Sequence, residues 1–479
     1  MVNINRRQFL RGSSAFGFAA SLGAMSTLGA RQAWAADTSG YKAMVYLFLK
    51  GGMDHADTVI SYDETSWNQL RSIREGLFSA YGVDDPTSTR NRANLLKLNP
   101  DNADSLGGRE FAFPQELAPL HAMFDDGDLA VVGNVGPLIE NVNRTTMESG
   151  AAALPPRLFS HNDQQSTWMA LGTEGSLYGW GGRFIDAALA SSPGSNKTFA
   201  AISTGSNDPF LAGQTARPYR VTDQGSPVPY ILDRKYYLGQ NSADDQTRAQ
   251  IEAFLRRTSV DSRSLYERDF QTAKSRAFEN AQTIVEALDN VPELLTVFPE
   301  TKLGEQLKSV AQTINIQQFL NTSRQIFYVT MGGFDTHSTQ TRDLAMRHTE
   351  LADAIAAFRQ ALIEINRWNQ TVLFTASDFG RTTIDNGDGT DHGWGGHQIV
   401  AGGAVRGRNI YGALPGPEVG METYTESRGR LIPAYSVEQY AATIGRWWGL
   451  SGSEMYTALP NLSNFSDTDL GFMGSLAGT

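Results

Sequence analysis

The chain has 479 residues, a formal net charge of −11 at pH 7 and no cysteine. The lack of cysteine excludes disulfides, zinc sites with thiolate ligands and cysteine nucleophiles. Because 51 acidic residues outweigh 40 basic ones, we do not expect binding to nucleic acid or to an anionic membrane surface as the main function.

The first 35 residues have the pattern of an export signal. An Arg-Arg pair at positions 6 and 7 precedes Phe-Leu, and an Ala-Trp-Ala cleavage pattern ends at Ala35. This resembles a twin-arginine signal, which is a removable address and not an anchor. No later apolar run approaches the ~20 residues that span a bilayer. We therefore expect a periplasmic or extracellular protein, exported by the twin-arginine machinery, without stable membrane insertion.

Continuous apolar runs predict strands buried on both faces of a mainly parallel sheet. They cover Ala43–Leu49, Leu129–Val132, Thr198–Ser203, Gln325–Met331, Thr371–Phe374 and Gln398–Ala404. Helical patterns at Pro114–Phe124 and Leu344–Ile365 supply the alternation of an α/β domain. We expect one domain over residues 36–479, its sheet flanked by helices, with insertions at about 62–113 and 205–320.

Two of these runs end in Gly-Gly followed by an acidic residue. The first leads to Asp54, and the fourth leads to Asp335 and His337. Ligands of open α/β sheets bind at the carboxyl ends of the strands. Asp335 and His337 are two residues apart, so in an extended segment both side chains point the same way and form a two-ligand arm. A turn with a helix-capping aspartate is the alternative interpretation for Asp54.

The stretch Thr375–His397 leaves a predicted strand as a loop rich in glycine, aspartate and histidine. Asp378, His392 and His397 are its candidate metal ligands, because metal-assisted sites are built from such donors on loops at strand ends. A solvated turn region is the alternative interpretation, since the Asp-Asn-Gly-Asp-Gly segment within it is also ordinary turn chemistry.

Ser160 and His161 begin a third informative stretch. Ser160 with Asp163 three residues later predicts a helix start of the capping-box type. A helix N-terminus beside a hydroxyl and an imidazole also favours an anion, so Ser160, Ser166 and Thr167 are candidate nucleophiles.

The histidines are concentrated in such segments. His121 and His348 look like ordinary helix residues, whereas the other five lie beside aspartates in glycine-rich or helix-start segments: His55, His161, His337, His392 and His397. Oxygen and imidazole donors without thiolate suit one or two divalent ions such as Zn²⁺ or Mn²⁺.

Six motifs together resemble the exported bacterial family known as domain of unknown function 1501. They are Gly-Gly-x-Asp at 51–54, Ser-His-x-Asp-Gln-Gln at 160–165, Gly-Trp-Gly-Gly-Arg at 179–183, Phe-Asp-Thr-His-Ser at 334–338, Ser-Asp-Phe-Gly-Arg at 377–381 and Asp-His-Gly-Trp-Gly-Gly-His at 391–397. That family is similar to the alkaline phosphatase/sulfatase superfamily, which implies metals at strand ends and a Ser or Thr nucleophile.

The resemblance implies a role for each matching residue. Ser160 or a neighbour would be the nucleophile, with His161 beside it, and Arg381 would balance the phosphoryl charge. The implied metal ligands are Asp54, Asp335, His337, Asp378, His392 and His397. His392 enters as a substitute, because Phe379 stands where the superfamily has a histidine.

The implied function is metal-assisted hydrolysis of phosphate or sulfate esters, in small molecules or polymers. Two alternatives stay open. The chain is a non-catalytic exported binding or assembly protein on a degenerate scaffold, or a metal-dependent enzyme of another kind that acts on carbohydrate or polymer substrates.

Overall fold

A nine-stranded mixed sheet forms the centre of the chain in the computed structural model, which describes residues 35–192, 194–205, 208–221, 224–228, 249–250, 253–254, 264–418, 423–425 and 429–474. The strand order is β13-β5-β12-β9-β1-β8-β6-β7, and β14 pairs with β5. Except for Ala35, the predicted signal peptide (residues 1–35) lies outside the described residues. In the part of the chain that is described, no helix is long and apolar enough to cross a membrane.

All six predicted strands are present. The strands of the sheet are β1 (Lys42–Leu49), β5 (Leu129–Gly136), β6 (Ala201–Ser203), β7 (Tyr219–Arg220), β8 (Arg324–Met331), β9 (Thr371–Ser377), β12 (Gly396–Ala401), β13 (Ile410–Gly412) and β14 (Tyr435–Ser436). β12 is antiparallel to both of its neighbours, and the other pairs are parallel. The predicted class, a mainly parallel α/β sheet flanked by helices, is confirmed.

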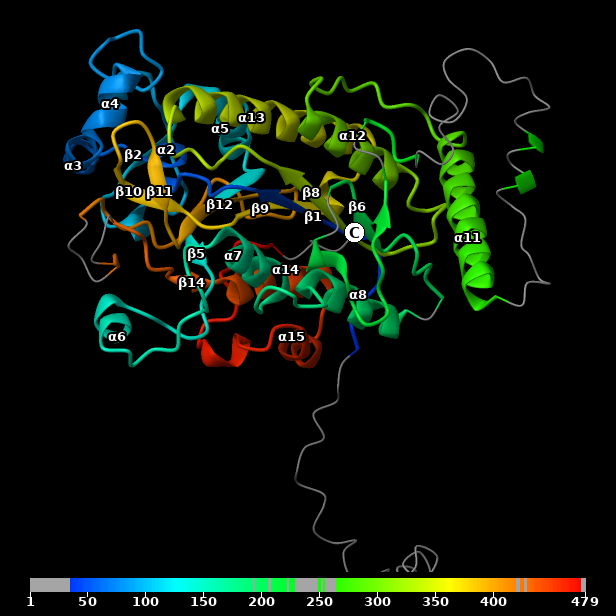
Figure 1. Cartoon of the computed structure of the whole chain (residues 1–479). Helices are drawn as coiled ribbons and strands as arrows, with labels where there is room; N and C mark the ends of the chain where they lie inside the picture. Colours follow the sequence, from blue (N-terminus) through cyan, green and yellow to red (C-terminus); the bar gives the residue numbers. More distant parts are fainter. Residues whose placement is uncertain are drawn as a thin grey trace, which may run out of the picture. The chain divides into compact units, whose positions relative to one another are not determined.

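Helices cover both faces of the sheet (Figure 1). One face is covered by α5 (Ala118–Asp125), α12 (Lys302–Asn315) and α13 (Gln340–Glu364), and the other by α7 (His161–Ala170), α8 (Trp180–Ser191), α14 (Val437–Trp448) and α15 (Gly452–Ala458). Along β1, Val45 and Leu47 pack on the first face, whereas Tyr46 and Phe48 pack on the second. Burying each such side chain stabilises the fold by about 1.5–3 kcal/mol.

The register of the central strands brings three acidic segments to one edge. Leu49, at the end of β1, is paired with Met331 of β8 and with Ser377 of β9. Gly51 follows β1 with φ +118°, and a Cβ there would lie only 2.3 Å from the backbone nitrogen of Asp335. Glycine is therefore required at this position, both for the backbone conformation and for the close approach of the two chain segments.

The Thr375–His397 stretch, predicted as a loop, contains an antiparallel hairpin of β10 (Arg381–Asp385) and β11 (Thr390–His392). The region predicted as the first insertion includes α3 (Glu64–Ile73) and α4 (Glu75–Tyr81). A small three-stranded sheet joins this region: β2 (Ile60–Ser61), β3 (Leu96–Lys97) and β4 (Phe111–Phe113). Of the predicted second insertion, the described part includes α11 (Leu265–Leu288) and α12.

His348 of α13 is a fully buried histidine beneath this edge, as its sequence context predicts. Its Nε2 lies 3.0 Å from the hydroxyl of Thr58, which itself donates to the backbone oxygen of Asp54. Nδ1 of His348 is buried without a hydrogen-bond partner. Burial lowers the pKa of His348 to about 3, because the charged ring would lose its hydration.

We expect His348 to make the protein acid-sensitive. Between pH 6.5 and about 3 the unfolded chain binds a proton on this ring and the folded chain does not, so its contribution to stability is present above pH 6.5 and is lost as the pH falls. The loss amounts to about 2 kcal/mol at pH 5. Urea unfolding at pH 7.5 and pH 5 should show a smaller acid loss in His348→Gln than in the wild type. The control is His121→Gln, which should lose as much stability between pH 7.5 and pH 5 as the wild type. An equally large loss in His348→Gln would contradict this assignment.

Candidate metal centre

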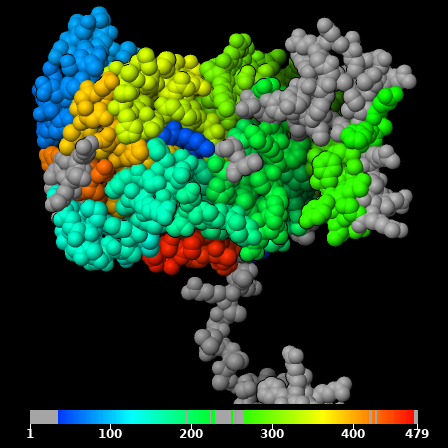
Figure 2. Space-filling model, in the orientation of Figure 1, coloured from blue at the N-terminus to red at the C-terminus, as the bar shows by residue number. Residues whose placement is uncertain are grey.

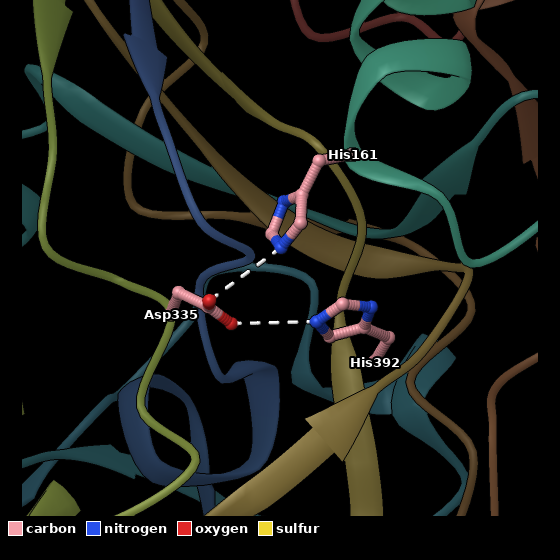
Figure 3. Close-up of side chains that lie close together, drawn as sticks. All are labelled: His161, Asp335 and His392. Atoms are coloured by element: carbon pink, nitrogen blue, oxygen red, sulfur yellow. Dashed lines mark ion pairs between the residues drawn. The ribbon is translucent and has the colours of Figure 1, made fainter.

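Three side chains from distant parts of the sequence point toward one another at the carboxyl edge of the sheet (Figure 3). His161 is the first residue of α7, His392 is the last residue of β11, and Asp335 lies between β8 and α13. His161 Nε2 is 3.5 Å from Asp335 Oδ2, and His392 Nε2 is 3.4 Å from Asp335 Oδ1. One ligand atom from each of the three lies within 4.8 Å of the others.

His337 adds a fourth donor to this group. Its Nε2 is 3.1 Å from Asp335 Oδ1 and 2.9 Å from the Nε2 of His392. The two-ligand arm predicted from the spacing of Asp335 and His337 therefore does bring both side chains together. We call His161, Asp335, His337 and His392 the His/Asp cluster.

Each histidine of the cluster presents its Nδ1 to an oxygen on its other side. His161 Nδ1 lies 2.5 Å from Asp378 Oδ2, and His392 Nδ1 lies 2.8 Å from the backbone oxygen of Phe159. His337 Nδ1 faces Asp391 Oδ1 at 3.3 Å. Oxygen acceptors at Nδ1 favour the tautomer with the proton there, which leaves the Nε2 lone pairs directed into the cluster.

The contact between two Nε2 atoms tests whether a cation fits here. Two unprotonated imidazole nitrogens cannot hydrogen-bond to each other, yet those of His337 and His392 are 2.9 Å apart. A proton on one of the two Nε2 atoms, in a neutral or a charged ring, or a metal ion makes this approach favourable. The close group of His161, Asp335 and His392 offers two imidazole nitrogens and a carboxylate, and His337 contacts two of its members. Such donors suit Zn²⁺ or Mn²⁺, so the residues present fit a divalent ion.

Arg381 forms an ion pair with Asp335. Its guanidinium is fully buried and donates to Asp335 Oδ1 at 2.8 Å, to the backbone oxygen of Gly51 at 3.1 Å and to the hydroxyl of Thr390 at 3.2 Å. Burial acts to raise the pKa of Asp335, but the hydrogen bond and charge of Arg381 outweigh it and lower that pKa. The predicted role of Arg381, balancing a phosphoryl charge, would need donors that these contacts already use.

The surroundings shift the pKa values of the three histidines in different directions. The hydrogen bond to Asp378 is the main cause that raises the pKa of His161. Burial, followed by the charge of Arg381, lowers the pKa of His337, and burial likewise lowers that of His392. The ring of Phe379 stacks on His392 with centroids 4.5 Å apart, so an apolar wall stands where the resemblance leads one to expect a histidine.

Asp54, a predicted ligand, is paired with an arginine instead. Arg74 donates to its two carboxylate oxygens at 2.6 and 2.9 Å, and the amide of Gln340 donates at 2.6 Å. Asp54 is also the N-cap of α2 (His55–Thr58), as the alternative interpretation held. Burial acts to raise its pKa, but Arg74 lowers it to about 2. With these partners Asp54 has no carboxylate oxygen left for an ion.

Two further predicted ligands make other contacts. Asp378 is fully buried: its Oδ2 lies 2.5 Å from His161 Nδ1, whereas its Oδ1 is buried without a hydrogen-bond partner. His397 accepts a hydrogen bond at Nδ1 from the backbone of Asn134 at 3.0 Å. Its ring lies 5.2 Å from that of His55, and burial holds its pKa well below the usual value.

Ser160 is the N-cap residue of α7, but its hydroxyl does not cap the helix. It donates to Asp163 Oδ2 at 2.9 Å, so the predicted capping box is not formed. Ser166 and Thr167, the other candidate nucleophiles, donate to the backbone oxygens of Thr173 and Asp163. Of the three candidates, Ser160 has a carboxylate as its acceptor.

Sequence reasoning missed the partners that decide these roles. Arg74 lies between α3 and α4 and Gln340 begins α13, neither in a motif, and nothing local links them to Asp54. His161 was expected beside the nucleophile and lies in the His/Asp cluster. Asp391 belongs to a recognised motif, and its position directly before His392 was a usable signal.

The Asp54–Arg74 pair is fully buried, so removing one partner should leave an unpaired charge. We expect Arg74→Met to lower the free energy of unfolding by about 3–5 kcal/mol, and Arg74→Met with Asp54→Asn to recover part of it. The matched control is Arg71→Met, which breaks the exposed pair with Asp84 and should cost at most about 1 kcal/mol. Equal urea unfolding curves for Arg74→Met and Arg71→Met would contradict this view of the pair.

The sheet and the cluster can be compared with known proteins. The chain is similar to the C-terminal periplasmic domain of EcEptC from Escherichia coli (TM-score 0.33, 10% identity, 93% of this chain and 90% of that one). It is also similar to the lipoteichoic acid synthase LtaP from Listeria monocytogenes (0.31, 8%, 90% and 74%) and to the alkaline phosphatase from the Antarctic bacterium TAB5 (0.27, 9%, 76% and 92%). Likenesses with TM-scores this low say nothing about the chemistry of this chain.

No protein with a curated description matches the chain in sequence. A family model, in contrast, matches residues 41–457, which is most of the chain. The resemblance carried by the six motifs is thereby confirmed, and the chain belongs to the family described as "Protein of unknown function (DUF1501)".

Proposed function

We propose that the protein hydrolyses phosphate or sulfate esters with one divalent metal ion held by the His/Asp cluster. The observation that carries the proposal is the group of His161, Asp335 and His392, whose ligand atoms lie within 4.8 Å of one another. Because the three Nδ1 atoms face oxygen acceptors, the Nε2 lone pairs are the donors left for an ion. Zn²⁺ and Mn²⁺ are the ions we propose.

The surroundings of Asp54 support one ion and not two. Arg74 supplies the positive charge beside this carboxylate and uses both of its oxygens. Among the described residues, no second group of three or more acidic or histidine ligands lies close enough to hold an ion. The earlier expectation of one or two ions is therefore narrowed to one in this proposal.

Ser160 is the nucleophile we propose, with Asp163 as its base. When bound, a divalent cation supplies the Lewis acid that polarises the ester. Ser160 Oγ forms the bond to phosphorus or sulfur while its proton passes to Asp163 Oδ2, and the alkoxide leaves with the bonding electrons and takes a proton from solvent. Water then forms a bond to the phosphorus or sulfur and releases a proton to solvent, while the bond to Ser160 Oγ breaks and this oxygen takes back the proton from Asp163 Oδ2. Asp378 and Arg381 hold His161 and Asp335 in place throughout.

A non-catalytic binding or assembly protein is the second candidate. The Arg74 pair at Asp54 and the Phe379 ring beside His392 favour it, since both stand where the resemblance implies metal ligands. Both candidate functions include export to the periplasm or the extracellular space. It rests on residues 1–35, which apart from Ala35 lie outside the described residues.

We expect the natively exported protein to carry about one Zn²⁺ or Mn²⁺ per chain, measured by elemental analysis. His337→Ala and His392→Ala should lose the ion, because each removes one Nε2 donor. Asp378→Asn should weaken its affinity about 10- to 100-fold, because His161 loses the partner that orients it. Ion at 100 times its Kd should add about 2.7 kcal/mol to the free energy of unfolding of the chelated protein.

The matched control for the histidine variants is His121→Ala, which removes a histidine of α5 outside the cluster. Equal metal content in His392→Ala and His121→Ala would refute the proposed ligand set. The proposed ion would be refuted if the native protein contained no metal and added Zn²⁺ and Mn²⁺ left its free energy of unfolding unchanged.

A panel of phosphomonoesters, phosphodiesters and sulfate esters tests the reaction itself. We expect the metal-loaded protein to hydrolyse one of these classes, and Ser160→Ala to lower kcat at least about a hundredfold with its metal retained. Ser166→Ala, whose hydroxyl donates to a backbone oxygen, should retain activity. Metal-loaded wild type without activity on any class would favour the non-catalytic candidate, and activity in Ser160→Ala would move the nucleophile to water.

A further inference from the structure

A cavity of about 410 Å³ lies at the carboxyl ends of β6 and β8. Residues at the ends of β1 and β7 line it, as do residues of α12 and α13. We call it the basic pocket, because four of its lining residues are Lys50, Arg220, Lys302 and Arg347. Glu350 is the acidic residue among those that line it.

The charge of the pocket is opposite to that of the protein. The chain as a whole carries −11, yet four cationic side chains face this cavity against one carboxylate. Glu350 accepts hydrogen bonds from Arg347 at 2.7 Å and from the backbone nitrogen of Leu303 at 3.4 Å. Its carboxylate is therefore paired with other residues that line the pocket. Lys50 lies 2.9 Å from Asp208, so this cation is paired with an acid outside the lining residues. An anion is the ligand that this excess favours.

The pocket and the His/Asp cluster share a piece of backbone. Gly332 lines the pocket, and Asp335 lies three residues further along the chain. Their Cα atoms are therefore at most about 11 Å apart. On the neighbouring strand, Lys50 lines the pocket, and the Cβ position of the next residue, Gly51, is 2.3 Å from the backbone of Asp335.

This part of the molecule reaches the surface. In Figure 2 the dark-blue part of the chain, which includes the end of β1, is exposed between the yellow part with α13 and the cyan part before α8. Lys50 is half-buried, and Arg220 and Lys302 are exposed, so a ligand can reach the cationic groups from solvent.

We infer that the basic pocket binds a phosphate or sulfate group, and that this group is the second anionic group of the ester cleaved at the His/Asp cluster. Binding of the anion rests on the pocket alone, whereas its assignment to the substrate rests on the proposed function. The substrate class is then a bis-anionic ester, with its two charged groups separated by roughly the distance from Gly332 to Asp335.

Anion binding is tested by titration calorimetry of the chelated full chain with inorganic phosphate and with sulfate. We expect saturable binding to the wild type, weakened about tenfold or more in Arg220→Gln/Lys302→Gln, because two charge-assisted contacts are lost. Arg220→Lys/Lys302→Arg, which keeps both charges, should restore it. The matched control is Arg276→Gln/Lys308→Gln, which removes the same charge from α11 and α12 outside the pocket. The pocket would not be an anion site if the wild type bound neither phosphate nor sulfate. The same holds if Arg220→Gln/Lys302→Gln and Arg276→Gln/Lys308→Gln bound the anion equally well.

Hydrolysis of a sugar bisphosphate and of p-nitrophenyl phosphate separates substrate from free anion. If the second group belongs to the substrate, Arg220→Gln/Lys302→Gln should raise KM for the bisphosphate about tenfold and leave KM for the monoester and the metal content unchanged. Equal KM changes for both esters would assign the pocket to free phosphate or sulfate instead. If the wild type binds the anion but hydrolyses neither ester, the proposed function is refuted. Anion binding by the basic pocket is then unaffected.

Discussion

The hydrogen bonds on the far sides of the histidines are the constraint on which the site depends. Oxygen acceptors at Nδ1 favour the tautomer that leaves a lone pair at Nε2, and Asp378, the Phe159 backbone and Asp391 lie at these positions. These acceptors come from the end of β9, the segment before α7 and the hairpin β10–β11. The donor set therefore exists only when the sheet edge, α7 and the hairpin are assembled together.

Burial makes this arrangement rigid. Arg381 and Asp378 are fully buried, and a buried charge is tolerated only when it is paired. Arg381 meets Asp335 and the Gly51 backbone, while Asp378 meets His161 and Gln165. Moving Arg381 would break contacts with two chain segments at once, and moving Asp378 would break two contacts with α7. The site is held by its electrostatic partners as much as by the apolar core beneath it.

The sequence predicted what depends on local pattern. Continuous apolar runs identified the strands, because both faces of the sheet are covered, and the strand ends identified the edge where Asp335, His337 and His392 meet. It did not predict which acid would face an ion and which would meet an arginine or the back of a histidine. Asp54 and Asp378 both follow strands of the central sheet. Their contacts are decided by Arg74, 20 residues along the chain from Asp54, and by His161, 217 residues from Asp378.

Arg74 changes what the edge can do. A guanidinium carries one positive charge and cannot exchange or open a coordination position, whereas a divalent ion carries two and can bind a substrate oxygen. With Arg74 fixed on Asp54, the second positive partner for a phosphate or sulfate ester has to come from elsewhere. The basic pocket lies on the same strand ends and supplies cations of that kind. In the function that we propose, one ion would activate the reacting group, and the fixed charges of the basic pocket would hold the rest of the anion.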